Sequence, residues 1–225
     1  MSILSILAVL AASTPAEAPV AVAPETSQYQ ECIALVKSDI ERGRLHAQQW
    51  VSTGGGADAR HCLAVADLES GFPRLAAARL EEIAERKDAG DDLIRARVLA
   101  QAAEAWLKAD ETANALRTIT EALLLVPDSG ELQLTAAKVF ATLEQWQKVI
   151  TAVDAAEEAG IISAETFVHR GRAYYAFGNY ETAAQDVVNA LSIAPTNIDA
   201  LVLRGDLQQT GIVIDVFYDG PDKTD

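Results

Sequence analysis

The chain has 225 residues, half of them apolar, with 33 acidic and 18 basic residues and a formal net charge of −15. A chain of this length and apolar content can bury the core of one or two domains. Its negative charge would repel nucleic acids and anionic membrane surfaces, and no dense run of Lys or Arg opposes that charge. Composition therefore disfavours nucleic-acid binding.

The N-terminal segment, residues 1–27, shows neither helical nor strand periodicity after an apolar run at residues 3–12. That run is too short to span a bilayer, but it fits the apolar part of a secretory signal, with a small-residue site at residues 16–18. The lack of Lys or Arg before the run and the position of Pro19 after the site weigh against this interpretation. We expect a signal peptide and linker of an exported, periplasmic protein. The alternative is a cytoplasmic protein with an irregular N-terminus or a misplaced start codon.

Cys32 and Cys62 are the only two cysteines, and both lie in helical patterns. A helix over residues 41–53 could connect those two helices and make them neighbours. In an oxidising compartment the pair would form a disulfide, which stabilises a loop of about 30 residues by roughly 3 to 4 kcal/mol. Two buried free thiols are the alternative. A metal site using these cysteines and His61 is disfavoured, because it has at most three ligands and no short ligand spacing.

The body of the chain, residues 28–211, is predicted to be all-helical. Apolar residues recur three and four positions apart, as in Leu116, Ile119 and Leu123, and glycines or prolines interrupt the pattern at intervals that suit short helices. Superimposed on this is a period of 34 residues. The recurring sets are Trp106, Phe140 and Tyr174; Ile119, Val153 and Val187; and Ala122, Ala156 and Ala190. A helix pair repeated at this interval indicates a superhelical stack.

The stretch from Ala164 to Asn197 closely resembles a tetratricopeptide repeat (TPR). The matching positions are Phe167, Gly171, Tyr174, the turn Gly178-Asn179-Tyr180, Ala183, Ala190 and Pro195. Small residues let the paired helices approach, tyrosines fill the space between repeats, and Pro195 ends the second helix. Arg170 departs from the motif, because a leucine is common there.

The resemblance implies a right-handed superhelical α-solenoid of antiparallel helix pairs. We expect an N-terminal capping helix pair at residues 28–56 and a C-terminal capping helix at 198–211. Four repeats fill 57–197, at 57–95, 96–129, 130–163 and 164–197, and the first carries about five extra residues near 91–95. The tail, 212–225, begins with a strand-like apolar run at 212–217, which we expect to pack on the last helix or pair with a partner, with a disordered end as the alternative.

In such stacks the first helix of each pair lines a concave groove where segments of other proteins dock. The resemblance places eight residues on that surface: Glu104, Leu107, Lys108, Leu134, Lys138, Val168, Arg172 and Tyr175. The three cations could receive acidic groups of a partner, or they are ordinary solvated charges. The Asn and Lys carboxylate clamp of chaperone-binding relatives is absent from these positions, which disfavours that class of partner.

These features favour a non-catalytic scaffold of the cell envelope that binds a protein or peptide segment. The three histidines lie far apart in sequence, and no phosphate loop, nucleophile elbow or HExxH motif occurs, so neither a catalytic site nor a cofactor is expected. A self-associating structural module, using the exposed ends of the stack or the tail, is the main alternative. A helical enzyme or metal-binding protein is a third, less favoured one.

Overall fold

The computed structural model describes residues 27–214, which form eleven α-helices and no strand. In chain order they are α1 (Gln28–Ser38), α2 (Ile40–Ser52), α3 (Gly56–Glu69), α4 (Pro73–Ala84), α5 (Asp92–Lys108), α6 (Thr112–Leu125), α7 (Gly130–Thr142), α8 (Trp146–Glu158), α9 (Ala164–Ala176), α10 (Tyr180–Ile193) and α11 (Ile198–Gln209). The predicted signal peptide and linker, residues 1–27, lie outside the described residues except for Ser27, which caps α1.

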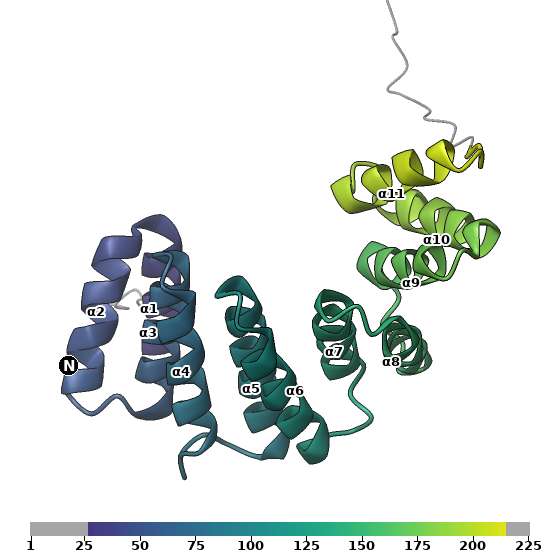
Figure 1. Ribbon diagram of the computed structural model, residues 1–225. Coiled ribbons are helices and arrows are strands. Elements are labelled where there is room, and N and C mark those ends of the chain that lie inside the picture. The colour runs from purple at the N-terminus through teal and green to yellow at the C-terminus, as the bar shows by residue number, and fades with distance from the viewer. Residues whose placement is uncertain (1–26, 215–225) are drawn as a thin grey trace, which may run out of the picture.

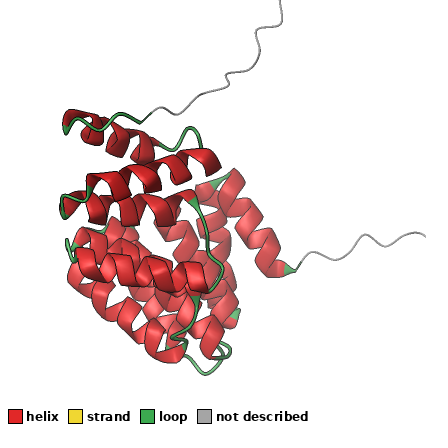
Figure 2. Ribbon diagram, turned by 90° about the vertical axis from the view of Figure 1, so that its right-hand side faces the viewer, coloured by secondary structure: helices red, strands yellow, loops and turns green. Residues whose placement is uncertain are grey.

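Consecutive helices pack as antiparallel pairs, and the pairs stack into an arch with α1 to α4 at one end and α11 at the other (Figure 1). The first helices of neighbouring pairs also touch, α5 with α7, α7 with α9 and α9 with α11. Figure 2 shows the same all-helical stack from the side. This is the α-solenoid that the sequence predicts.

The residues of the 34-residue register form the spine of the stack. Ile119, Val153 and Val187 are fully buried, as are the three alanines at the next recurring position. Tyr174 packs against the two largest core clusters at once, one running mainly from α3 to α8 and one from α9 to α11. It therefore fills the space between repeats, as expected for a spine aromatic.

The turns inside the pairs share one backbone shape. Gly71, Asp110, Glu144 and Gly178 all have positive φ, at 81°, 58°, 54° and 75°, and the last three are 34 residues apart. Glycine adopts this left-handed conformation freely, whereas other residues do so at a cost of about 1 kcal/mol. The repeats thus keep the turn of the best-matching unit even where the glycine has been lost.

The extra residues before the second repeat lengthen a helix. Asp91 caps α5 by accepting a hydrogen bond from the backbone N–H of Ile94, and residues 92–95 form the first turn of this 17-residue helix. The guanidinium of Arg95 donates to the carbonyl oxygens of Gly90 at 3.2 Å and Arg86 at 2.9 Å. These bonds secure the connection from α4.

The first repeat has a carboxylate in the aromatic position. Asp67 lies 39 residues before Trp106, which is one period plus the five extra residues, and its side chain is fully buried. It accepts hydrogen bonds from Arg44 of α2 and Arg79 of α4, both at 2.7 Å. A buried charge needs such partners, so Asp67 ties three helices together where an aromatic ring would have filled space.

Arg170, the departure from the repeat motif, joins three helices in the same way. From α9 it donates two hydrogen bonds to the nearly buried Asp186 of α10, at 3.1 and 2.9 Å, and it reaches Glu157 of α8 at 2.6 Å. The hydrogen bonds to Asp186 and the nearby carboxylates raise the pKa of Arg170. A leucine at this position would leave the carboxylates of α8 and α10 without their shared cation.

After α11 the chain packs back on the last core cluster. Ile214 is 7 % exposed and Ile212 lies against the same cluster, in line with the expectation that the apolar run covers the last helix. Residues 212–214 form no strand, and residues 215–217 of the predicted strand-like run lie outside the described part. Within residues 27–214, none of the helices has both the length and the apolar character that crossing a membrane requires.

Candidate partner groove

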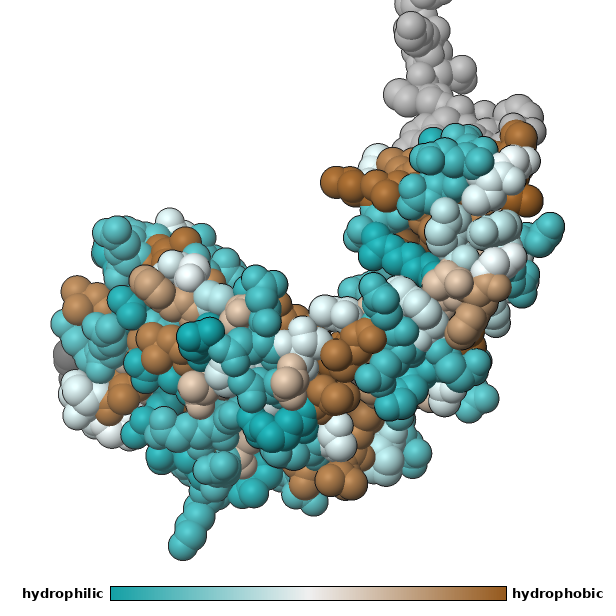
Figure 3. All heavy atoms as spheres, in the orientation of Figure 1, coloured by the Kyte–Doolittle hydropathy of each residue, from teal (hydrophilic) through white to brown (hydrophobic). Residues whose placement is uncertain are grey.

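A hollow of about 540 Å³, here called the groove, lies between the first helices of the second half of the stack. Figure 3 shows that the molecule is hollowed between its two ends and that apolar side chains gather near the middle of this view. The groove is lined by Leu107 of α5, Lys138, Ala141 and Thr142 of α7, Trp146 of α8, Glu165, Val168, His169 and Arg172 of α9, and Asn197 and Asp199 at the start of α11.

The groove combines an apolar part with charged groups. Leu107, Ala141 and the half-buried Trp146 supply apolar surface, and the nearly buried Val168 lies beneath it. Large aromatic faces that stay partly exposed in a hollow are typical anchoring surfaces for a side chain of a bound segment. The apolar part can therefore hold one side chain or a short run of a partner.

The charged groups form a set of ion pairs that we call the charge ladder. It consists of Arg97 with Glu131 at 3.0 Å, Lys138 with Glu104 at 2.9 Å and with Glu165 at 3.0 Å, and Arg172 with Asp199 at 2.7 Å. Each pair joins the first helix of one repeat to that of the next. The ladder thus links α5, α7, α9 and α11, and four of its members, Lys138, Glu165, Arg172 and Asp199, line the groove.

The register of the repeats explains the ladder. Glu104, Lys138 and Arg172 occupy one repeat position, 34 residues apart. Glu131, Glu165 and Asp199 occupy another, and Lys138 and Arg172 each meet the carboxylate 27 residues later. These two pairs cross from one column to the other, whereas Arg97 with Glu131 and Glu104 with Lys138 are pairs within one column, 34 residues apart.

The ladder keeps Glu165 and Lys138 ionised. His169, 3.8 Å from Glu165, and then Lys138 lower the pKa of Glu165 to about 2 against the effect of partial burial. Burial alone would lower the pKa of Lys138, but the hydrogen bonds and charges of Glu104 and Glu165 outweigh it and raise that pKa. At neutral pH both groups are charged.

The structure brings together only some of the predicted groove residues. Leu107, Lys138, Val168 and Arg172 line the groove, and Glu104 is tied to it through Lys138. Leu134, Lys108 and Tyr175 do not line it. Lys108 is exposed without an ion pair among the described residues, and Tyr175 instead packs against Tyr180, with ring centroids 5.4 Å apart.

The sequence leaves two interpretations of Lys138 and Arg172 open, cations that receive acidic groups of a partner or ordinary solvated charges. In the structure both are paired inside the molecule. The physical reason is the column of carboxylates one repeat further on. An acidic partner would have to displace a carboxylate that is already well placed.

Several lining residues escaped prediction. Trp146 is the first residue of a second helix, so a rule that looks only at first helices misses it. Glu165 and Asp199 carry a signal that was present in the sequence, namely acidic residues recurring every 34 positions from Glu131. Thr142 and Asn197, at the ends of α7 and α11, carry no such signal.

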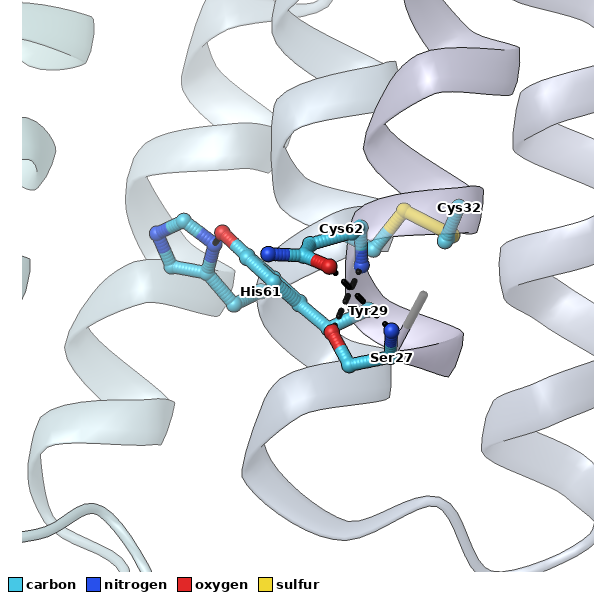
Figure 4. Close-up of a disulfide and its surroundings, with 6 residues drawn as sticks. Ser27, Tyr29, Cys32, His61 and Cys62 are labelled. Atoms are coloured by element: carbon cyan, nitrogen blue, oxygen red, sulfur yellow. Dashed lines mark hydrogen bonds between the residues drawn. A yellow bond between two sulfur atoms is a disulfide. The ribbon is translucent and has the colours of Figure 1, made fainter. Parts of the chain in front are cut away.

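The N-terminal end of the stack is closed by a disulfide between Cys32 of α1 and Cys62 of α3 (Figure 4). Next to it the Tyr29 hydroxyl hydrogen-bonds Nδ1 of His61 at 2.9 Å, and Nε2 of His61 bonds Gln101 of α5 at 2.7 Å. Both sulfurs are thus bonded to each other and are not available to a metal. Among residues 27–214, no three His, Cys, Asp or Glu side chains cluster as metal ligands.

Comparison with known proteins places the fold. The chain is similar to a TPR protein of Thermus thermophilus, with a TM-score of 0.60, 18 % identity and coverage of 80 % of this chain and 99 % of that one. It is also similar to YrrB, described as a TPR protein with an unusual peptide-binding site (TM-score 0.59, 18 % identity, 79 % and 90 % covered), and to MamA (TM-score 0.61, 15 % identity, 74 % and 94 % covered). No protein-family model and no curated protein matches the sequence. The fold is therefore that of the TPR solenoids.

Proposed function

We propose that the protein is a non-catalytic scaffold that holds a segment of another protein in the groove. The observation that carries this proposal is the half-buried Trp146 beside Leu107, Ala141 and Val168 in an open hollow of about 540 Å³. The solenoid fold supports it, because stacked helix pairs present long concave surfaces that suit extended or helical segments. YrrB, a structural neighbour, is described as having a peptide-binding site.

The ion pairs also support a scaffold. The charged side chains of the groove bond to the neighbouring repeat, so they fix the curvature of the surface and leave the apolar part to contact the partner. We infer that apolar and shape contacts decide which segment binds. The paired charges then contribute mainly to specificity.

The test is photo-crosslinking in the cell of origin, with a photoreactive residue at Thr142 in the groove or at Thr151 on α8 as the matched control. Both threonines are exposed and neither has a large side chain to lose. We expect Thr142, and not Thr151, to capture a defined partner, and Trp146→Ala to abolish that capture. Equal capture from both positions would show that the groove is not the binding surface.

We further propose that the protein is exported to the periplasm or cell envelope. Support comes from the disulfide at the N-terminal end of the stack and from the apolar run at residues 3–12. Thiol labelling of whole cells under denaturing conditions tests this location. We expect Cys32 and Cys62 to resist labelling until a reductant is added. We also expect the chain in those cells to have been shortened at its N-terminus. Reduced thiols in a chain that retains Met1 would favour the cytoplasm.

A further inference from the structure

A second surface lies at the C-terminal end of the stack. There α11 repeats a set of residues that is buried on α9 but exposed on α11. Ala164, Val168 and Gly171 lie on one face of α9, four and three residues apart, and all three are buried. Their counterparts 34 residues later are Ile198, 75 % exposed, Val202, 52 % exposed, and the half-exposed Gly205. We call these last three residues the open stripe.

Gly171 of α9 and Gly205 of α11 differ in whether another helix packs on them. A β-carbon on Gly171 would meet Leu203 of α11 at 3.1 Å, the β-carbon of Asp186 at 3.2 Å and the backbone oxygen of Ala183 at 3.5 Å, so neighbouring helices pack directly on this glycine. A β-carbon on Gly205 would meet nothing within 4 Å. Thus α11 has the small residue that allows close helix packing, but no described helix lies there.

The arginine before each glycine, Arg170 on α9 and Arg204 on α11, differs in whether it has an acidic partner. Arg170 binds the carboxylates of Asp154, Glu157 and Asp186. Arg204 occupies the same position in α11, and it has no carboxylate within ion-pair distance among the described residues. The first two carboxylates are replaced one repeat later by Val188 and Leu191. A helix packed on the open stripe would therefore be favoured by an acidic residue facing Arg204.

From these observations we propose that the open stripe with Arg204 is a docking surface for an amphipathic helix of another protein. The helix would carry a small residue three positions before an acidic one, as α10 does with Ala183 and Asp186. The small residue lies against Gly205, the acid binds Arg204, and apolar residues of the helix cover Val202 and Ile198. None of Ile198, Val202 and Gly205 lines the groove, although Ile198 lies between Asn197 and Asp199 of that lining.

A second copy of this chain is the less suitable occupant. The α10 of a second copy has the matching pattern, but its Ala183 is fully buried and its Asp186 is 3 % exposed and bonded to Arg170. It could present those residues only by opening its own last repeat. A helix whose small and acidic residues are free avoids that cost.

The α10 sequence itself provides a probe. A fluorescent peptide of residues 179–195, with its own capping Asn179, is titrated against the full chain and followed by anisotropy. We expect saturable binding of the peptide. Its affinity should fall about tenfold or more for a chain carrying Gly205→Leu, because the leucine fills the packing site. The chain variant Arg204→Gln and a peptide with Asp186→Asn should each lower the affinity about as much as Gly205→Leu does. When the two are combined, their losses of affinity should not add, because they remove the same ion pair.

The Gly205→Leu variant should fold normally, because its side chain enters open space and leucine favours helix more than glycine does. Its circular dichroism and urea midpoint confirm this before binding is compared. No binding up to about 1 mM peptide, or equal binding to all variants, would overturn the proposal. So would binding that appears only after residues 215–225 are removed, since the chain's own end would then be the occupant. A dimer seen by light scattering and abolished by Gly205→Leu would overturn it as well, because a second copy would then take the site.

Discussion

Asp67 places a buried, hydrogen-bonded carboxylate at the position where the later repeats have an aromatic ring. Its carboxylate is fully buried and bonded to two arginines that are each about a third exposed. We expect Asp67→Asn to lower the free energy of unfolding by about 2 kcal/mol, because the amide has the same shape but cannot balance two positive charges. Urea unfolding measures the loss.

The matched control for this change is Asp39→Asn. Asp39 pairs with Arg42 at 4.0 Å on the surface, and its role as the N-cap of α2 can be taken over by asparagine. The expected change is below about 0.5 kcal/mol. If both variants lost the same stability, the buried position of Asp67 would not be the reason for its effect.

Glu165 makes the stability of the ladder depend on pH. Its folded pKa of about 2 lies below the ordinary value of 4.5, so folding favours the ionised form. The contribution is fully present above about pH 4.5 and is lost as the pH falls toward 2. Because the side chain is nearly half exposed, we expect no more than about 1 kcal/mol. The difference in urea midpoint between the wild type and Glu165→Gln should shrink between pH 6 and pH 2.5, and a constant difference would contradict this.

At the scale of the helix, Gly171 of α9 and Gly205 of α11 occupy the same repeat position, and substituting each by alanine tests how tightly its helix is packed. Gly205→Ala should stabilise the protein by about 0.5 to 1 kcal/mol, because alanine favours the helix and meets no neighbour. Gly171→Ala should instead destabilise it by about 1 kcal/mol, since the new methyl group presses on Leu203 and on Asp186, which Arg170 holds in place. Thermal unfolding compares them. Equal effects would mean that α9 is less tightly packed than the contacts indicate.

The disulfide acts on the capping element α1. Replacing both Cys32 and Cys62 by serine should cost about 3 to 4 kcal/mol, since the bond closes 30 residues of chain and the two positions are fully buried. Adding a reductant should lower the urea midpoint of the wild type toward that of the double variant. The variant itself should not respond, and a response would point to an effect of the reductant elsewhere.

At the scale of the whole molecule, the period of the chain made the architecture predictable. Trp106, Phe140 and Tyr174 set the register, and the match from Phe167 to Pro195 indicated the kind of solenoid. The groove was harder to predict, because the spacing within one helix does not show which groups Lys138 and Arg172 bind. Their partners come from the next repeat, and only a comparison of two columns of charge across the period would have paired them.

Two other features depend on three-dimensional neighbours that sequence spacing does not reveal. Asp67 resembles a solvated helix carboxylate until α2 and α4 place arginines on both sides of it. Gly205 resembles Gly171 in sequence, yet one is packed and the other open. Local patterns therefore specify the repeat, whereas the ends of the stack and its charge pairs depend on which repeat comes next.

The two ends of the stack should differ in how easily they open. A terminal repeat has a neighbour on one side only, so local unfolding starts at the ends of a solenoid. Here α1 is bound to α3 by the disulfide, whereas α11 is held by α9, α10 and the few residues that pack on it. Hydrogen exchange should therefore be fastest in α11, slower in α1 and slowest in α5 to α8. In the double serine variant, exchange in α1 should rise toward that of α11 while α7 stays protected. Equal protection of α11 and α7 in the wild type would mean that the open stripe is covered in solution, and that the C-terminal end is not the weak end of this solenoid.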